Sequence, residues 1–566
     1  MGNTEMKITQ FADDTCLYLN GISSLENVLK VFEDFYRYAG LRLNKDKTEM
    51  FWLGKNNRTG KCFDINISTQ PTKVLGLWLS KNTDEIIKIN MDERITKLKS
   101  LLNMWKQRNL TLKGKITILR SQALPLVLFA GTFLYMSDKI IEEIETILYS
   151  FVWPKGKHHV KKMTLIESIP NGGLKMPDFN SMLKALKLTS VRRLISSKGS
   201  CSLTAKHILK TDNLFSFFKC KNKTVFLHTM PQYYKQLLDM WYSVYTNVST
   251  SVNDVMNEMI WNNASILRDN KPIKNKKWEE QGIKQIQDLF NENMDFMSKL
   301  QIETVYNVKC NIIFLKGIKS AIPRKWIEII NNTDLQIMKT IKAEKQQQTQ
   351  LSIKINKKFV NIDNLKCNQL YWSEIEKKGL RPTSYYKWES EYYYATFDWE
   401  QINQIPYVCA RETSLQSLQY QIIHRFYPCR YMLNIWKLES DNKCKFCKEI
   451  DSIQHYFFDC KYVSLFWNCV KTWFKYNFDF VIKFGPLDIL LGIPNYDQNH
   501  EITILNFVIL FGKYYIKTCK IKEKAIEFYE YQVELKERML ITSRRVKALA
   551  SQHLPTRNEQ GSRTQR

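Results

Sequence analysis

The sequence predicts an α+β fold in which a small sheet-containing unit precedes a long, mostly helical chain with a small metal-binding segment. Short β-prone runs alternate with turn residues over the first eighty residues. From Asp92 to Arg193, apolar residues recur with the 3.6-residue period of helices. One group of Cys and His residues near the C-terminus has metal-ligand spacing. With 566 residues, 44% of them hydrophobic, the chain has enough apolar surface for buried cores, and its length suggests roughly three or four domains of about 150 residues each.

The first forty residues predict a strand, a tight turn, a second strand and a helix. Residues 8–12 and 15–19 are the β-prone runs, and Asp13-Asp14 between them is turn chemistry, which places both carboxylates at a hairpin tip. Ser23 and Glu26 have the spacing of a capping box, and Gly40 is a typical helix stop. The pattern therefore predicts one helix between these signals.

The next segments are a second hairpin, a strand and then helices. Residues 41–43 and 50–53 flank a polar turn, and residues 73–79 form one further predicted strand. A basic loop interrupts the helices that follow, and its lysines could track a phosphate backbone: Lys155, Lys157, Lys161 and Lys162.

The second half of the chain is less regular in pattern. Residues 200–400 are mostly helical in periodicity, with a polar linker near 340–350. The aromatic-dense segment 385–399 is either core or a surface on which bases stack, and core is the favoured interpretation. The basic, polar tail 542–566 has too few apolar residues to order itself and is predicted to be disordered.

The net charge and the pattern of the N-terminal residues indicate which partners and which cell compartment to expect. Lys and Arg number 84 against 56 Asp and Glu, a net charge of +28, which favours a nucleic-acid partner, although surface lysines also serve solubility alone. The opening residues lack an apolar signal region, and the longest apolar run, 123–136, is shorter than the ~18 residues of a membrane span. We therefore expect an intracellular protein, cytoplasmic, nuclear or both, without a membrane partner, whose cysteines are free thiols or metal ligands.

Two adjacent carboxylates repel each other unless a cation lies between them. In two-metal phosphoryl transfer, carboxylates hold a pair of Mg²⁺ ions about 3.5–4 Å apart. Asp13 and Asp14 are therefore candidate Mg²⁺ ligands, and the alternative is an ordinary solvated turn.

The second candidate site has the pattern C-x2-C-x7-H-x4-C, formed by Cys444, Cys447, His455 and Cys460. Four such ligands fill a tetrahedral Zn²⁺ and leave no open position, so the predicted zinc is structural; the alternative is four unrelated residues. His424 and Cys429 are rival ligands by proximity, although a helix-borne His424 is more typical of a core or rim. His158 and His159, beside four lysines, are expected to be solvated or to contact a nucleic-acid backbone.

The order of motifs resembles the palm of reverse transcriptases, more narrowly those of LINE-type (non-long-terminal-repeat) retrotransposons. The palm-like motifs are FADD (11–14), LNKDKTE (43–49) and VLGL (74–77). Three later segments look like that family's thumb: WKQRNLTLKGK (105–115), FVW (151–153) and GGLKMPDF (172–179). The Cys/His segment is similar to the zinc-binding segment C-terminal to such enzymes, so the resemblance covers roughly residues 7–195 and 366–475.

The resemblance implies a function, cofactors and partners. Asp13 and Asp14 would hold Mg²⁺, and Lys47 would protonate the departing pyrophosphate, where the alternative for Lys47 is a surface lysine in a turn. An RNA template and a DNA primer would be the substrates. The family also uses an aspartate on an earlier strand, which the twelve residues before Asp13 lack. We therefore expect the C-terminal part of a longer polyprotein, whose N-terminal part would be a partner.

The expected domain order follows from the resemblance. It is a partial palm (1–80), a helical thumb-like domain (81–200), a helical region of unknown role (201–365), a domain containing the zinc segment 444–460 (366–475), a helical C-terminal region (476–541) and the tail (542–566). The alternative function is a non-catalytic, zinc-containing RNA- or DNA-binding protein derived from such an element. A third is a decayed reading frame without function.

Overall fold

The computed structural model describes most of the chain as two compact units that alternate along the sequence. The first unit comprises Met1–Ser100, Leu124–Glu145 and Phe179–Glu374, and the second comprises Leu101–Ala123, Thr146–Asp178 and Ile375–Arg566. The described residues are 7–12, 14–53, 59–68, 70–153, 158–196, 199–209, 214–219, 230–245, 251–343, 351–355, 358–478, 485–497 and 499–539. The predicted disordered tail therefore lies outside the described residues.

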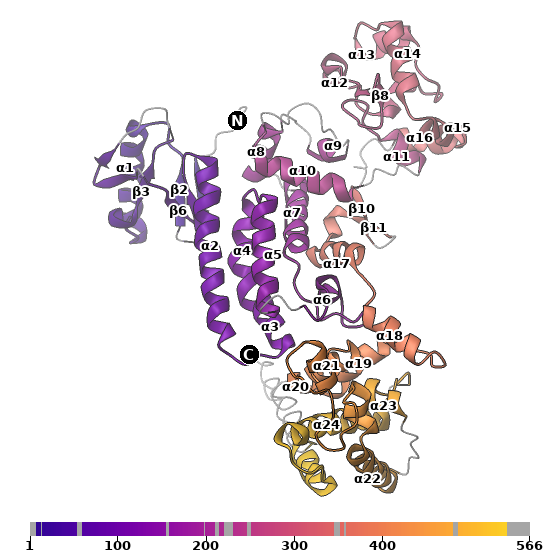
Figure 1. Ribbon diagram of the computed structural model, residues 1–566. Helices are drawn as coiled ribbons and strands as arrows, with labels where there is room; N and C mark the ends of the chain where they lie inside the picture. Colours follow the sequence, from indigo (N-terminus) through magenta and orange to yellow (C-terminus); the bar gives the residue numbers. More distant parts are fainter. Residues whose placement is uncertain are drawn as a thin grey trace, which may run out of the picture. The chain divides into compact units, whose positions relative to one another are not determined.

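The predicted first hairpin and helix are present in the first unit (Figure 1). β1 (Ile8–Phe11) pairs antiparallel with β2 (Asp14–Leu17), and Phe11 lies opposite Asp14. Asp14, which was expected in the turn, is therefore already part of a strand, and Ala12 has a left-handed φ of 52°. α1 (Ile22–Ala39) ends at Gly40, as predicted, where φ is 69°.

Three local predictions in this region were wrong. α1 begins after Gly21 without a side-chain cap, so the expected capping box is absent. Residues 41–43 form no strand; instead β3 (Glu49–Phe51), preceded by η1 (Lys45–Lys47), pairs parallel with β5 (Ile65–Ser68), and β4 (Gly60–Cys62) pairs antiparallel with β5. The expected single strand at 73–79 is a hairpin of β6 (Thr72–Val74) and β7 (Leu77–Leu79), because Leu75 and Gly76 take left-handed φ values of 48° and 80° and reverse the chain.

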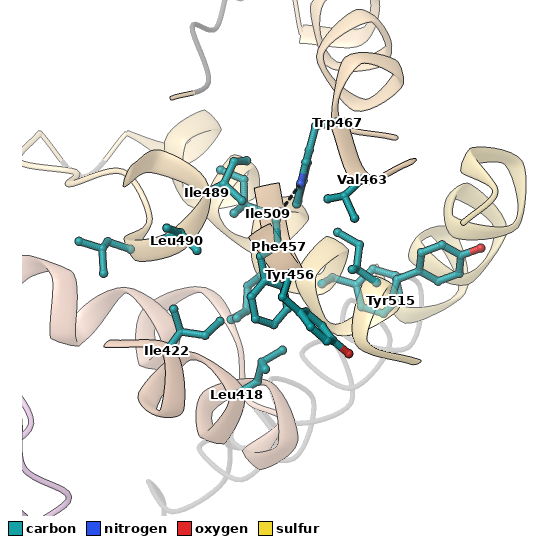
Figure 2. Close-up of a cluster of buried hydrophobic side chains, with 14 of the residues drawn as sticks. Leu418, Ile422, Tyr456, Phe457, Val463, Trp467, Ile489, Leu490, Ile509 and Tyr515 are labelled. Carbon is teal, nitrogen blue, oxygen red and sulfur yellow. Dashed lines mark hydrogen bonds between the residues drawn. The ribbon is translucent and has the colours of Figure 1, made fainter. Parts of the chain in front are cut away.

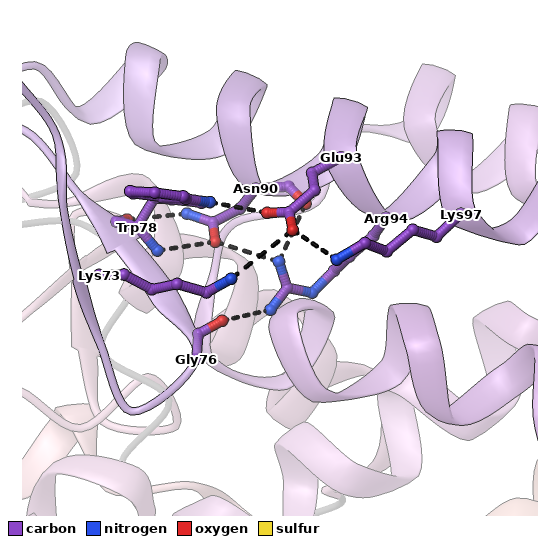
Figure 3. A network of polar contacts seen from close by, with 7 residues as sticks. All are labelled: Lys73, Gly76, Trp78, Asn90, Glu93, Arg94 and Lys97. Atoms are coloured by element: carbon purple, nitrogen blue, oxygen red, sulfur yellow. Dashed lines mark hydrogen bonds and ion pairs between the residues drawn. The ribbon is translucent and has the colours of Figure 1, made fainter.

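A polar network fixes the β6–β7 hairpin to the first part of α2 (Thr83–Lys106), as Figure 3 shows. The buried Asn90 side chain accepts from the Trp78 backbone N–H at 3.0 Å and donates to the Trp78 carbonyl at 2.8 Å. The Trp78 indole N–H donates to Glu93 at 2.7 Å, and Arg94 donates to the Gly76 carbonyl at 2.6 Å. Side chains of α2 thus replace strand partners along this hairpin.

The helical part of the first unit contains a fully buried lysine, Lys187. Its helices include α4 (Leu124–Phe133), the start of α5 (Asp138–Val152), α7 (Phe179–Ser196), α8 (Ser200–Ile208), α9 (Leu214–Lys219) and α10 (Gln232–Val244). α7 packs against α4 and α10. Lys187 on α7 donates to the Leu134 carbonyl and the Gln236 side chain at 2.6 and 2.7 Å, and burial lowers its pKa to about 7. Two neutral acceptors thus satisfy an ammonium that is removed from water.

A separate hydrophobic core forms between residues 252 and 338 of the first unit, with Trp261, Trp278 and Phe314 in mutual ring contact. Its elements are α11 (Val252–Met256), β8 (Leu267–Arg268), β9 (Lys271–Pro272), α12 (Lys276–Glu280), η4 (Ile286–Leu289), α13 (Lys299–Tyr306), α14 (Ile312–Ala321), α15 (Arg324–Asn331) and α16 (Leu335–Ala343). β10 (Ser352–Ile355), β11 (Lys358–Asn361), η5 (Ile362–Asn364) and α17 (Cys367–Lys378) follow. The expected linker near 340–350 falls on the end of α16 and on residues 344–350, outside the described part.

The second unit is mainly helical, and one large hydrophobic core joins its residues between Tyr385 and Leu535. Its elements are α3 (Leu112–Ile118), η2 (Leu119–Ala123), α6 (Lys162–Ile166), α18 (Thr383–Glu391), α19 (Trp399–Cys409), α20 (Thr413–Ile423), α21 (Arg430–Ile435), η6 (His455–Asp459), α22 (Lys461–Phe478), α23 (Pro486–Leu491) and α24 (His500–Lys522). Figure 2 shows aromatic and aliphatic side chains of α20, η6, α22, α23 and α24 meeting around Phe457. The predicted α+β mixture of helices and small sheets is confirmed.

Two helical segments are long and apolar enough to cross a membrane by length and composition, Leu112–Phe133 and His500–Lys522. The first overlaps the run 123–136, which seemed too short in the sequence, because the helical segment begins earlier, at Leu112, and ends at Phe133. Of the most apolar window of α24, 61% is buried inside the protein, where Lys513 donates to the Gln419 side chain and the Leu490 carbonyl. A buried core helix meets the same length and composition criteria as a membrane-spanning helix, so the two segments are weak evidence for a membrane span.

The aromatic-dense segment divides between core and surface. Tyr385, Trp388 and Tyr392 are buried in the core of the second unit. Tyr393 and Tyr394 are exposed on the surface. The favoured interpretation as core holds for the first three residues and not for the last two.

Candidate metal centre

The structure brings the four predicted zinc ligands together in the second unit. Their ligand atoms, from Cys444, Cys447, His455 and Cys460, all lie within 4.8 Å of one another. Cys447 Sγ is 3.1 Å from His455 Nε2 and 3.8 Å from Cys460 Sγ. Two sulfurs bound to one tetrahedral zinc at about 2.3 Å each would lie roughly 3.8 Å apart. The donor set and its spacing therefore fit a tetrahedral zinc ion.

A tight backbone turn presents the first two ligands on the same side. The Cys444 N–H donates to the Glu449 carbonyl at 2.7 Å, and the Lys448 N–H donates to the Cys444 carbonyl at 2.9 Å. Lys448 has a left-handed φ of 68°, and Lys443 pairs with Ile450 across the turn. The turn thus closes directly after Cys447.

A π-helical turn presents the other two ligands. His455 begins η6, and Cys460 follows its last residue. The Cys460 N–H donates to the His455 carbonyl at 3.2 Å, the i→i+5 bond of a π turn. In an α-helix, neighbours on one face are three or four residues apart, so ligands five apart would diverge. The wider turn accommodates the x4 spacing between His455 and Cys460.

The site is buried and its sulfurs are electrostatically coupled. Cys444, His455 and Cys460 are 2%, 8% and 0% exposed. Hydrogen bonds from Cys460 and His455 hold the pKa of Cys444 well below its usual value, and the interaction with Cys444, together with burial, raises that of Cys460. A lowered thiol pKa favours the thiolate, which is the form of cysteine that binds metal ions.

Two buried charged residues beside the cluster were missed by sequence reasoning. Lys520 of α24 places its Nζ 3.9 Å from Cys444 Sγ, and Asp451 lies between the two ligand pairs along the chain. Asp451 Oδ2 accepts the Arg430 backbone N–H at 3.1 Å. No local spacing links Lys520 to residues some seventy positions earlier. The only signal in the sequence is that this lysine stands in a largely apolar helical segment.

The two rival ligands lie outside the cluster. His424 is buried, with Nδ1 3.5 Å from Ser384 Oγ, and burial lowers its pKa to about 3. Cys429 is fully buried at the start of α21, and burial raises its pKa to about 12. Both side chains therefore belong to the core of the second unit, as the favoured interpretation of His424 proposed.

Solvation or contact with a nucleic-acid backbone was expected for both loop histidines, and the structure places His159 half-buried in the second unit. Its ring stacks on Phe426 at 5.4 Å between centroids and lies 5.2 Å from Trp153. His158 is exposed, with its ring stacked on Tyr149 at 4.7 Å. His159 thus fills an aromatic cluster of the second unit, because the imidazole ring packs as a flat apolar surface.

The predicted phosphate-contacting lysines are only partly described. Lys155 and Lys157 lie outside the described residues. Lys161 is exposed at the N-terminus of α6, and Lys162 is its half-buried first residue. Their contact with a nucleic-acid backbone stays a prediction.

The segment 170–178, which overlaps the thumb-like motif GGLKMPDF (172–179), packs against the C-terminal part of the second unit. The Asn403 side chain donates to the Pro170 carbonyl at 2.8 Å, and Lys378 pairs with Asp178 at 2.7 Å. Gly172 has a φ of 83°, and an added Cβ there would lie 2.3 Å from the Tyr385 hydroxyl. The glycine is therefore required by a close approach as well as by its backbone conformation.

The predicted Mg²⁺ ligands and Lys47 are placed as follows. Asp14 is the exposed first residue of β2 instead of part of the turn, and Asp13 lies outside the described residues. Lys47 is the exposed last residue of η1, where its backbone N–H donates to the Asn44 side chain at 3.1 Å. The functions assigned to these three residues stay predictions.

Two segments of the chain match models of known protein families. Residues 2–79 match the family model described as "Reverse transcriptase (RNA-dependent DNA polymerase)", and residues 386–467 match the one described as "zinc-binding in reverse transcriptase". The chain is related to reverse transcriptases. The reverse-transcriptase match contains Asp13, Asp14 and Lys47, and the zinc-binding match contains all four residues of the Cys/His cluster. Relatedness to reverse transcriptases implies binding of nucleic acid, and the matched segment together with the cluster indicates Zn²⁺ as the metal.

Proposed function

We propose that this chain is part of a LINE-type reverse transcriptase that adds deoxynucleotides to a primer 3′-hydroxyl on an RNA template. The observation that carries the proposal is the order of the two matches: a reverse-transcriptase segment at 2–79, then a zinc-binding segment whose Cys₃His ligands meet in space. The motif order FADD, LNKDKTE and VLGL supports the narrower assignment to LINE-type elements.

In this proposal Asp13 and Asp14 hold Mg²⁺, which supplies charge neutralisation at the reacting phosphate when bound. Lys47 donates a proton to the departing pyrophosphate, since an ammonium beside a triphosphate both neutralises charge and can release a proton. Residues 1–80 act as palm and 81–200 as thumb. Base pairing selects the nucleotide, so the protein reads only backbone and shape.

The zinc has a structural function in this proposal. Its four protein ligands leave no position for water or substrate, so the ion contributes folding free energy to the segment 444–460 and takes no part in the chemistry.

A second candidate is a non-catalytic, zinc-containing protein that binds RNA or DNA. The observation that favours it is that the reverse-transcriptase match ends at residue 79, whereas the zinc ligands are all present.

Primer extension separates the two candidates. The full chain is supplied with an RNA template, a DNA primer, Mg²⁺ and labelled deoxynucleotide, alongside Asp13→Ala and the matched control Asp34→Ala, an exposed aspartate of α1. Incorporation that Asp13→Ala abolishes and Asp34→Ala retains supports the polymerase. No incorporation, with RNA affinity that falls steeply as salt rises, supports the binding protein. A chain that neither incorporates nucleotide nor binds RNA would contradict both candidates.

A further inference from the structure

Lys520 is a buried cation whose neighbours are the metal cluster and a carboxylate. Its side chain is 5% exposed near the end of α24. Nζ lies 3.9 Å from Cys444 Sγ and 3.8 Å from Asp451 Oδ1, and 4.2 Å from the centroid of the Tyr456 ring. Burial of an ammonium is costly unless anions or hydrogen-bond acceptors surround it. The buried ammonium of Lys520 is therefore stabilised if negative charge is concentrated around it.

Lys513, the other buried lysine of α24, has different neighbours. Its ammonium donates to the Gln419 side chain and the Leu490 carbonyl, which are neutral acceptors that satisfy it without any anion. Lys520, seven residues later, faces a thiol sulfur and a carboxylate instead. The contrast within one helix indicates that Lys520 is placed to meet negative charge.

A charge count shows where that negative charge comes from. Three thiolates and a neutral imidazole on Zn²⁺ give a net charge of +2 − 3 = −1 for the ligand set of Cys444, Cys447, His455 and Cys460. Ionised Asp451, buried at 3% side-chain exposure, brings the sum to −2, and Lys520 returns it to −1. An N–H donor to a ligating sulfur also stabilises that sulfur as a thiolate.

We propose that Lys520 is the charge-balancing, positioning residue of the zinc centre, and that its contact with Cys444 couples metal binding to the packing of α24. The proposal rests on the proposed zinc site and adds a residue that lies outside the matched segment 386–467. Zinc affinity and the attachment of the end of α24 then depend on each other.

The test is the Zn²⁺ affinity of the full chain, measured by competition with a chromophoric chelator. The relevant site is the one that Cys447→Ser removes. Lys520→Met keeps the length of the side chain without its charge, and we expect it to weaken Zn²⁺ binding about 10–100-fold, the usual effect of losing a partner of a metal ligand. Lys522→Met, at an exposed position of the same helical turn, is the matched control and should bind as the wild type does.

A second variant separates charge from packing and covers the case in which Lys520→Met does not fold. Lys520→Met combined with Asp451→Asn removes the opposing charge and keeps an oxygen for the Arg430 N–H. If charge balance is the cause, the double variant should recover most of the lost Zn²⁺ affinity. With Co²⁺ in place of Zn²⁺ as a spectroscopic probe, its thiolate-to-Co²⁺ absorption band should match that of the wild type. A packing defect predicts no recovery.

The outcomes also separate this inference from the zinc proposal itself. If the wild-type chain has no Cys447-dependent Zn²⁺ site, the zinc proposal fails, and this inference with it. If the wild type binds and Lys520→Met binds equally well, or the double variant binds no better than the single one, only the function assigned to Lys520 is overturned.

Discussion

Gly512 of α24 lies directly against the indole of Trp467 of α22, so closely that a Cβ added at Gly512 would be 2.7 Å from Trp467 Cη2. The indole cannot easily move aside, since its N–H donates to the Phe457 carbonyl at 2.8 Å beside the metal ligands of η6. The approach of these two helices therefore depends on the missing side chain.

Gly512→Ala should destabilise the second unit by about 1–3 kcal/mol, although alanine is the better helix former. Urea unfolding followed by tryptophan fluorescence measures the change. Gly21→Ala is the control, because nothing lies within 4 Å of a Cβ at that position. A Gly512→Ala protein as stable as the wild type would show that the two helices can separate without cost.

Removal of the metal should destabilise the second unit and expose its thiols. Zinc at one hundred times its dissociation constant stabilises a folded protein by about 2.7 kcal/mol, so a strong chelator should lower the unfolding midpoint accordingly. Cys447→Ser should abolish this response to chelator, whereas Cys469→Ser, at an exposed position of α22, should retain it. Equal responses from the two variants would place the metal elsewhere.

Asn90 should contribute to stability out of proportion to its size. It satisfies both backbone groups of Trp78 and also donates to the Ile86 carbonyl at 2.8 Å, in a fully buried position. Asn90→Ala leaves these groups unpaired, at a cost of about 2 kcal/mol. Faster hydrogen exchange at the Trp78 amide, measured against Lys88→Ala on the exposed side of α2, would report release of the β6–β7 hairpin. Unchanged exchange would mean that the strand pairing alone holds the hairpin.

His424 should make the second unit sensitive to mild acid. Burial lowers its pKa in the folded state to about 3, below the unfolded value of 6.5, so its contribution is fully present above pH 6.5 and is lost as the pH falls. At pH 5 the loss is about 2 kcal/mol. His424→Phe should retain the ring contact with Tyr420 and flatten the dependence of stability on pH between 6.5 and 4. The urea unfolding midpoints of the wild type and of His424→Phe are measured at pH 7 and at pH 5. An equal fall in the midpoint in both proteins would rule out His424 as the cause of the acid sensitivity.

Much of the local structure could be predicted because it depends on neighbouring residues. The β1–β2 hairpin, the end of α1 at Gly40 and the helical periodicity from Asp92 onward follow from turn chemistry and apolar spacing, although α2 begins earlier, at Thr83. The cysteine and histidine spacing also named the four residues that meet in space. Such features are encoded within a few residues of where they occur.

The remaining features depend on parts of the chain that are distant in sequence. The parallel pairing of β3 with β5 displaced the expected second hairpin, because a strand partner fourteen or more residues away supplied the hydrogen bonds.

The sequence alone therefore determined the ligand types, the local turns and the relation to reverse transcriptases. The tertiary structure decided which residues surround the metal ligands. Lys520 comes to Cys444 from 76 positions away, because the apolar side chains of α24 pack into the core of the second unit and bring the lysine with them. Burial is a property of the whole fold, and no local pattern records it.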